Sequence, residues 1–218
     1  MDKNENYNIN EIKDIREIDL IKRLTKSFKK KNISTIIDVG DDAAILKFDK
    51  TNLALTQDIL VEGVHFDLSY VPLKHLGYKS IVVNISDIIS MNVKPSQVLV
   101  SIAVSNRFKV EALDEIYEGI KLACSFYGVD LIGGDTTSSN KGLMISVTCI
   151  GNTLNEKISL RKGSKEGDLL VVSGDLGSAY MGLQVLEREK KVFEVNPNSQ
   201  PDLSLSLIHI SEPTRPVT

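Results

Sequence analysis

The stretch Val98–Ile132, VLVSIAVSNRFKVEALDEIYEGIKLACSFYGVDLI, decides the fold class. Its first part, Val98–Val104, is a mostly apolar run that predicts a strand. Residues Val110–Tyr127 then repeat apolar side chains at helical spacing, and Gly128 is the residue type that commonly ends a helix. Another short apolar run, Val129–Ile132, follows at once. A strand, a helix and a second strand in this order are typical of an α/β or α+β domain.

The sequence on both sides extends this pattern. Apolar runs predict further strands at Ser34–Val39, Ala44–Phe48, Leu53–Leu60 and Leu143–Ile150. Helical spacing predicts helices at Asp14–Lys29 and at Leu73–Met91, the second of which begins next to Pro72. We therefore expect an α/β (α+β) fold.

A second domain is expected to begin after Gly151, where the chain becomes polar. In it, the apolar run Leu169–Ser173 predicts a strand, and Ser178–Glu189 predicts a helix. We divide the chain into a disordered leader (1–14), an N-terminal α/β domain (15–151), an incomplete C-terminal domain (152–203) and a tail (204–218).

The tail contains Leu205–Arg215, LSLIHISEPTR, which resembles the in-frame translation of a sequencing-library transposon adapter. We interpret residues 204–218 as an artefact of that origin, and the protein as truncated at its C-terminus. A genuine short amphipathic ending is the alternative.

Composition argues against several classes of function. The formal net charge is -3, and no dense basic run occurs beyond Lys29–Lys31, so nucleic acid is not an expected partner. The sequence has no run of about 18 apolar residues that could cross a membrane. Because Met1–Asn10 is polar and acidic, we expect a cytoplasmic protein. Cys124 and Cys149 are far apart and outside metal-binding spacings, which favours two buried thiols.

Four aspartates stand where predicted strands or helices meet loops: Asp42, Asp58, Asp87 and Asp135. Taken singly, each is most simply a turn former or a cap. If the fold gathers them, each close carboxylate pair repels by roughly 4 kcal/mol at an effective dielectric near 20, and a hard cation is needed. Oxygen ligands without paired Cys favour Mg²⁺, which proteins commonly share with substrate phosphates.

Phosphoryl transfer is therefore the chemistry that we expect. Gly133 and Gly134 would let the backbone before Asp135 approach a phosphate closely. The sequence has no GxxxxGK[ST] loop, no kinase-type GxGxxG and no HRD segment, which argues against the common nucleotide-binding folds.

Four motifs together resemble the thiamine-monophosphate kinase family. They are Val39-Gly40-Asp41-Asp42-Ala43-Ala44, Thr56-Gln57-Asp58 followed by Glu62-Gly63-Val64-His65-Phe66, Asn84-Ile85-Ser86-Asp87, and Leu131-Ile132-Gly133-Gly134-Asp135-Thr136-Thr137. They occur in the family's order, and the similarity runs from about Ile15 to Leu203. The resemblance implies a fold like that of aminoimidazole-ribonucleotide synthetase, with an N-terminal domain that forms a homodimer. It also implies transfer of the γ-phosphoryl group of ATP to thiamine monophosphate.

The resemblance also implies a role for individual residues. The magnesium ligands would be Asp42, Thr56, Gln57 through its backbone carbonyl, Asp58, Asp87 and Asp135. ATP would contact Gly134, Asp135 and Arg161, and thiamine monophosphate would contact His65. From the residues alone, Arg161 could also be a surface arginine before a linker, and His65 a partly buried loop histidine.

No protein nucleophile or general base is expected, because phosphoryl transfer depends on in-line positioning and charge neutralisation. Two positions depart from the family pattern: Gln57 replaces a small hydroxyl, and Met91-Asn92-Val93 replaces Met-Gly-Ala. Because the family's second domain carries a further metal motif, we expect impaired catalysis. The alternatives are another ATP-using enzyme of the superfamily, or a non-catalytic fragment that dimerises and binds nucleotide.

Overall fold

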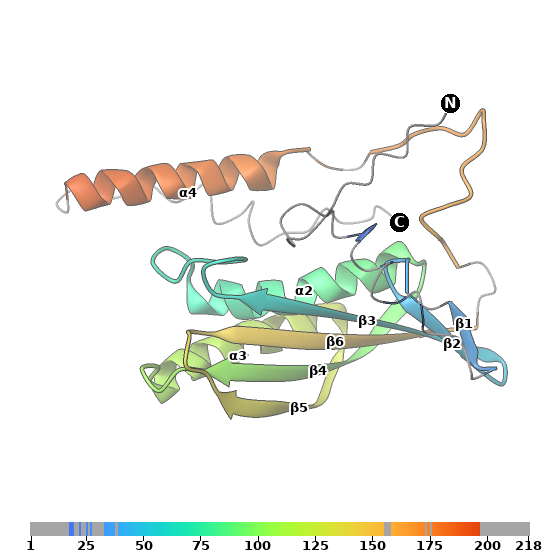
Figure 1. Cartoon of the computed structure of the whole chain (residues 1–218), viewed down its shortest axis with the longest axis horizontal. Helices are drawn as coiled ribbons and strands as arrows, with labels where there is room; N and C mark the ends of the chain where they lie inside the picture. The colour runs from blue at the N-terminus through green and yellow to red at the C-terminus, as the bar shows by residue number, and fades with distance from the viewer. Residues whose placement is uncertain are drawn as a thin grey trace.

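The computed structural model describes residues 18, 19, 22, 25, 27, 33–37, 39–154, 158–172, 174 and 176–196. These residues form a mixed sheet and three helices whose full bounds are described (Figure 1). The strands are β1 Thr35–Ile37, β2 Ala44–Phe48, β3 Thr51–Val61, β4 Lys94–Val104, β5 Asp130–Ser138 and β6 Met144–Thr153. The helices are α2 Leu73–Ser90, α3 Val110–Tyr127 and α4 Ser178–Val195. The expected α/β class is confirmed.

The sheet has the strand order β1-β2-β3-β6-β4-β5. Neighbouring strands are antiparallel, except that β4 and β5 run parallel. Parallel neighbours need a crossover connection, and α3 supplies it. This is the strand–helix–strand unit that the sequence predicted. At the edge of the sheet, every residue of β5 is exposed.

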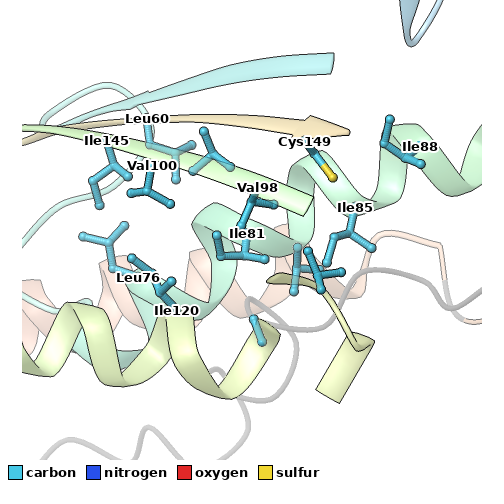
Figure 2. Close-up of a cluster of buried hydrophobic side chains, with 14 of the residues drawn as sticks. Leu60, Leu76, Ile81, Ile85, Ile88, Val98, Val100, Ile120, Ile145 and Cys149 are labelled. Atoms are coloured by element: carbon cyan, nitrogen blue, oxygen red, sulfur yellow. The ribbon is translucent and has the colours of Figure 1, made fainter. Parts of the chain in front are cut away.

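The core lies on the face of the sheet that α2 covers, where α2 contacts β3, β4 and β6 (Figure 2). α3 packs in turn against α2. Ile81 and Ile85 of α2, Ile120 of α3 and Val98 and Ile145 of the sheet are all buried in one apolar cluster. Burial of apolar surface stabilises a fold by about 25 cal/mol per Å². The cluster therefore fixes α2 on the sheet.

Two glycines allow α2 and α3 to approach closely. A Cβ atom at Gly77 would lie 1.9 Å from the carbonyl O of Ile116. A Cβ atom at Gly119 would lie 1.9 Å from the carbonyl O of Lys74. Both distances are far below van der Waals contact, so a larger residue would push the helices apart.

Helix bounds agree well with the sequence predictions. α3 spans Val110–Tyr127 as expected, and Gly128 ends it in the left-handed conformation with φ 65°. α2 ends at Ser90, one residue before the predicted end. The strand predicted at Val129–Ile132 is instead β5, which continues to Ser138. Asp135 therefore lies within a strand and not after one.

The strand predicted at Leu169–Ser173 is wrong for the residues that the structure describes there. Leu169–Val172 have no strand conformation, and Leu170 is 96% exposed. A strand needs a neighbouring strand for its backbone hydrogen bonds, and no described segment pairs with this run. α4 follows it and is longer than the helix predicted at Ser178–Glu189.

α4 contacts the loop that follows β3. Lys190 Nζ donates to Asp67 Oδ2 at 2.8 Å and lies 5.8 Å from the centre of the Tyr70 ring. Leu186 of α4 is buried, whereas Met181 is exposed.

Some predictions fall on residues outside the described set. They are the leader (1–14), the tail (204–218) and most of the helix Asp14–Lys29, of which Ile18, Asp19, Lys22 and Thr25 are described as helical. The domain boundaries stay predictions. Among the helices that the structure describes, none is long and apolar enough to cross a membrane.

Candidate functional site

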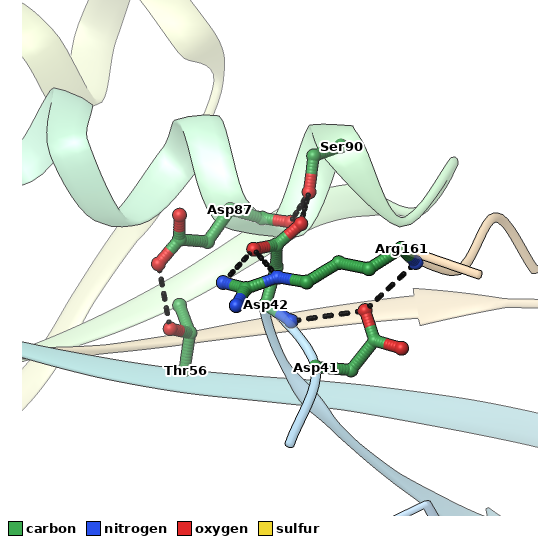
Figure 3. A network of polar contacts seen from close by, with 6 residues as sticks. All are labelled: Asp41, Asp42, Thr56, Asp87, Ser90 and Arg161. Carbon is green, nitrogen blue, oxygen red and sulfur yellow. Dashed lines mark hydrogen bonds and ion pairs between the residues drawn. The ribbon is translucent and has the colours of Figure 1, made fainter. Parts of the chain in front are cut away.

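Two of the predicted site residues meet where α2 lies against β3. Thr56 Oγ1 donates a hydrogen bond to Asp87 Oδ2 at 3.0 Å (Figure 3). Thr56 points to the helix-covered face because it lies two residues beyond the buried Ala54, and side chains alternate along a strand. The contact joins a strand residue to a helix residue that are far apart in the sequence.

Asp58 also contacts α2, through its backbone N–H. Its N–H donates to Asn84 Oδ1 at 3.0 Å, and Asn84 lies one helical turn before Asp87. Burial raises the pKa of the Asp58 carboxyl, and the nearby His65 lowers it. The raised pKa means that a charged Asp58 is costly here without a cation.

The charged form of Asp87 is disfavoured for the same reason as that of Asp58. Burial raises the pKa of its carboxyl, and the hydrogen bond from Thr56 acts in the opposite direction. The negative charges of Asp58 and Asp42 raise the pKa of Asp87 as well. The carboxylates of Asp58 and Asp42 are therefore each near enough to Asp87 to repel it.

Arg161 partly offsets this repulsion by pairing with Asp42. Arg161 Nε donates to Asp42 Oδ1 at 2.7 Å, and the guanidinium Nη2 forms an ion pair with the same oxygen (Figure 3). The Arg161 hydrogen bond holds the pKa of Asp42 below its usual value, although burial acts to raise it. Ser90 Oγ donates to Asp42 Oδ2 at 2.9 Å. Asp41 Oδ1 accepts from the backbone N–H of Arg161 at 3.3 Å.

A pocket of about 690 Å³ opens beside these groups. Asp42, Thr56, Gln57 and Arg161 line it, and Lys22 lies on its wall. It combines carboxylate oxygens, a hydroxyl and two cationic side chains, which is the chemistry that a metal-bound phosphate requires.

The donor set fits magnesium and does not fit zinc. The oxygen donors are the carboxylates of Asp42, Asp58 and Asp87 and the hydroxyl of Thr56. Within the described residues, however, no group of three or more His, Cys, Asp or Glu side chains is already arranged to hold a metal ion. Mg²⁺ usually takes one or two carboxylates and fills its other positions with water and phosphate oxygens. The residues present suit such an open site better than a closed protein cage.

Asp135 lies apart from this group. It pairs with Ser101 of β4, which pairs with Ser146 of β6, which pairs with Ile59 of β3. Since neighbouring strands lie about 4.8 Å apart, three spacings separate Asp135 from β3. Directly opposed residues share a face of the sheet, so Asp135 is on the side opposite Asp58. The described residues therefore do not bring Asp135 to the other carboxylates.

Gly134 has a structural role in its strand. A Cβ atom there would lie 1.7 Å from the carbonyl O of Val100, and its φ is 156°. Glycine is required at this position for β5 to lie against β4, whether or not a nucleotide binds nearby.

Gln57 and His65 lie at the margins of the site. The Gln57 side chain lies on the face of the sheet opposite α2, where its Nε2 donates to Ser146 Oγ at 3.1 Å. His65 is exposed just beyond β3, and its Nδ1 accepts from the backbone N–H of Val61 at 3.0 Å. Lys79 Nζ donates to the carbonyl O of His65 at 3.3 Å. These contacts leave His65 accessible to a ligand.

Sequence reasoning missed the contribution of Ser90 and the buried contact of Asn84. Both lie on the stripe of α2 that carries Asp87, because the three positions are three residues apart. That three-residue spacing within the predicted helix Leu73–Met91 was the available signal.

Comparison with known proteins defines the class of this domain. Residues 40–153 match the family described as AIR synthase related protein, N-terminal domain, and the chain belongs to this family.

More particular relatives are thiamine-monophosphate kinases. The enzyme of Aquifex aeolicus is 37% identical over 183 residues, which cover 84% of this chain and 56% of the relative. The enzyme of Bacillus subtilis is 38% identical over 157 residues, covering 72% of this chain and 48% of the relative. A solved structure, AaThiL complexed with AMPPCP and TMP, superposes with a TM-score of 0.77 at 32% identity, covering 94% of this chain and 62% of that one. The chain thus spans about half the length of the curated relatives it matches.

Proposed function

We propose that this chain provides the metal- and nucleotide-binding domain of an ATP-dependent kinase that phosphorylates thiamine monophosphate to thiamine diphosphate. The observation that carries the proposal is the meeting of Asp42, Thr56, Asp58 and Asp87 around the end of α2, with Arg161 paired to Asp42. Relatives of known name and the solved complex with AMPPCP, an ATP analogue, support it.

When bound, Mg²⁺ would supply charge neutralisation for the phosphates. Asp42, Asp58, Asp87 and the Thr56 hydroxyl would hold it, with water and phosphate oxygens completing its coordination. Asp135 and the backbone carbonyl of Gln57 are further proposed ligands. Because Asp135 lies on β5, apart from the other carboxylates, a metal ion bound by it would have to lie at that edge of the sheet.

Arg161 would bind the nucleotide phosphates with its guanidinium, which forms paired hydrogen bonds to phosphate oxygens. Gly134 would face ATP from β5. His65, exposed beside Asp58, would contact thiamine monophosphate. No described residue needs to act as a nucleophile, because the acceptor phosphate itself attacks in line.

We also propose that the protein forms a homodimer and acts in the cytoplasm. Support for the dimer comes from β5, an edge strand whose residues are all exposed, including Leu131 and Ile132. Unpaired edge strands readily pair with another chain. Both Cys124 and Cys149 are free thiols, which suits a reducing compartment.

The test is binding of a fluorescent ATP analogue to the 218-residue chain with and without Mg²⁺. We expect Mg²⁺-dependent binding, and Asp87→Asn should weaken it by more than the roughly 10- to 100-fold typical of losing an outer-shell partner. Asp114→Asn on exposed α3 is the matched control and should bind normally. If the affinity for the nucleotide changed neither on adding Mg²⁺ nor in Asp87→Asn, the proposal would be refuted.

The acceptor is tested separately. Thiamine monophosphate should alter the affinity of the chain for the nucleotide, and His65→Ala should reduce that effect while leaving nucleotide binding itself intact. An effect of other phosphorylated acceptors, with none from thiamine monophosphate, would instead favour a different ATP-using enzyme of the same superfamily.

A further inference from the structure

α2 presents a row of polar side chains to the candidate site. Asn84, Asp87 and Ser90 are each three residues apart, so they lie along one face of the helix. Each contacts a different part of the site: Asn84 the backbone of Asp58, Asp87 the hydroxyl of Thr56, and Ser90 the carboxylate of Asp42. Only Asp87 in this row is a proposed metal ligand.

Asn84 is the buried member of the row, with 0% of its surface exposed. Both halves of its amide are used: Oδ1 accepts from the Asp58 N–H at 3.0 Å, and Nδ2 donates to the Ser80 carbonyl O at 3.2 Å. The two contacts also fix which end of the amide faces β3. A buried amide without partners would be costly, so the pairing constrains the position of β3 relative to α2.

The end of β2 explains why β3 needs this contact. β2 pairs with β3 from Phe48↔Thr51 as far as Ala44↔Leu55. Asp58 lies beyond the last pair, so β2 offers no acceptor for its N–H. Asn84 provides the acceptor that another strand would have provided.

We propose that Asn84 is a positioning residue for the metal site: it holds the backbone of Asp58 at a fixed place relative to Asp87 on the same helix. The inference rests on the proposed function, because it concerns the site at which a divalent cation would be held. Outer-shell partners of this kind commonly change metal affinity by roughly 10- to 100-fold.

The test measures Mn²⁺ binding to the 218-residue chain by the loss of the free-ion signal in electron paramagnetic resonance. Mn²⁺ is used because it accepts the same oxygen ligands as Mg²⁺. In Asn84→Ala, we expect the Kd for Mn²⁺ to rise at least tenfold, at a temperature where thermal melts show the variant to be folded.

Ser80→Ala is the matched control. Ser80 is 1% exposed on the same helix, and its hydroxyl donates to the Gly77 carbonyl O, away from the site. This change should lower the melting temperature and leave Mn²⁺ binding within about twofold, since it removes no contact to the carboxylates.

Asn84→Asp covers the case in which Asn84→Ala does not fold. It keeps an oxygen that can accept from the Asp58 N–H but loses the donor to the Ser80 carbonyl O, so the comparison is made where thermal melts show it to be folded. There its Mn²⁺ affinity should equal or exceed that of the parent chain. A tenfold loss in Asn84→Asp, or unchanged binding in a folded Asn84→Ala, overturns the positioning role while the proposed function stands. If the parent chain binds no Mn²⁺, the proposed function itself fails, and the positioning role fails with it.

Discussion

Arg161 and a divalent cation would compete for the same oxygen, Oδ1 of Asp42. We therefore expect Arg161→Gln to have opposite effects on two ligands. Without nucleotide, Mn²⁺ binding should tighten about two- to fivefold, because an exposed ion pair is worth roughly 0.2–1 kcal/mol. ATP binding should weaken about tenfold or more, because a charged hydrogen bond to phosphate is lost. Titrations of each ligand with the other absent and present separate the two effects.

Arg188→Gln is the control for that comparison. Arg188 is an exposed arginine of α4, with its nearest acidic partner at 3.6 Å on the neighbouring Glu189. The change removes the same charge from the chain and should alter neither affinity. Weaker Mn²⁺ binding in Arg161→Gln would contradict a competition at Asp42.

The thiol of Cys149 gives a prediction away from the site. Burial raises the pKa of Cys149 to about 12, so it is protonated at ordinary pH. Because the thiolate is the reactive form, alkylation at pH 8 should leave Cys149 unmodified in the folded chain and modify it after denaturation. Peptide mass spectrometry distinguishes it from Cys124, which is partly exposed. Rapid native alkylation of Cys149 would show that the β6 face of the core opens readily.

How much of the site could be predicted differs from residue to residue. The resemblance placed both Thr56 and Asp87 at the metal site, but it did not predict their hydrogen bond, which joins the middle of β3 to α2. Asn84 was found as part of a motif, but its contact with the Asp58 backbone depends on where β2 stops, which is a tertiary property. The face on which Asp135 lies depends on strand register, and sequence periodicity alone does not fix register between strands.

At the scale of elements, the contact between α2 and α3 controls whether the polar row of α2 is in place. Gly119→Ala should destabilise the fold, because the added methyl would lie 1.9 Å from the Lys74 carbonyl O. Overpacking typically costs about 1–3 kcal/mol, and here the obstacle is backbone. The gain in helix propensity of about 1 kcal/mol opposes it, which leaves a net loss of up to about 2 kcal/mol. Urea unfolding measures the difference, with Ser125→Ala on the exposed part of α3 as control.

The link between α4 and the loop after β3 predicts a pH dependence. The hydrogen bond from Lys190 is the largest cause that lowers the pKa of Asp67 to about 2 from its ordinary 3.8. A lowered folded-state pKa means that the link is fully present above about pH 4 and is lost as the pH falls through 2. In Lys190→Met, the Asp67 carboxyl should titrate nearer its ordinary value, as followed by carboxyl chemical shifts in NMR. An unchanged titration would show that Lys190 does not bind Asp67 in solution.

Helices were predicted more accurately than strands for a physical reason. α3 is specified locally by its apolar repeat and by Gly128, and its predicted bounds are confirmed. A strand depends on a partner. β5 extends to Ser138 because β4 runs beside it, and Leu169–Val172 form no strand and stay exposed because no described strand pairs with them.

For the whole molecule, the exposed apolar surface predicts association. Leu131 and Ile132 are exposed on β5, and Leu169–Val172 are exposed beyond the sheet. If the edge of β5 forms the proposed dimer, Ile132→Lys should give a monomer in sedimentation velocity, because a charge on an edge strand opposes pairing. Leu122→Lys places the same charge at a similarly exposed apolar position of α3 and should leave the dimer intact. The opposite pattern would locate the contact on the helical layer. Association that neither change alters would instead point to the Leu169–Val172 run, where Leu170→Lys should then restore the monomer.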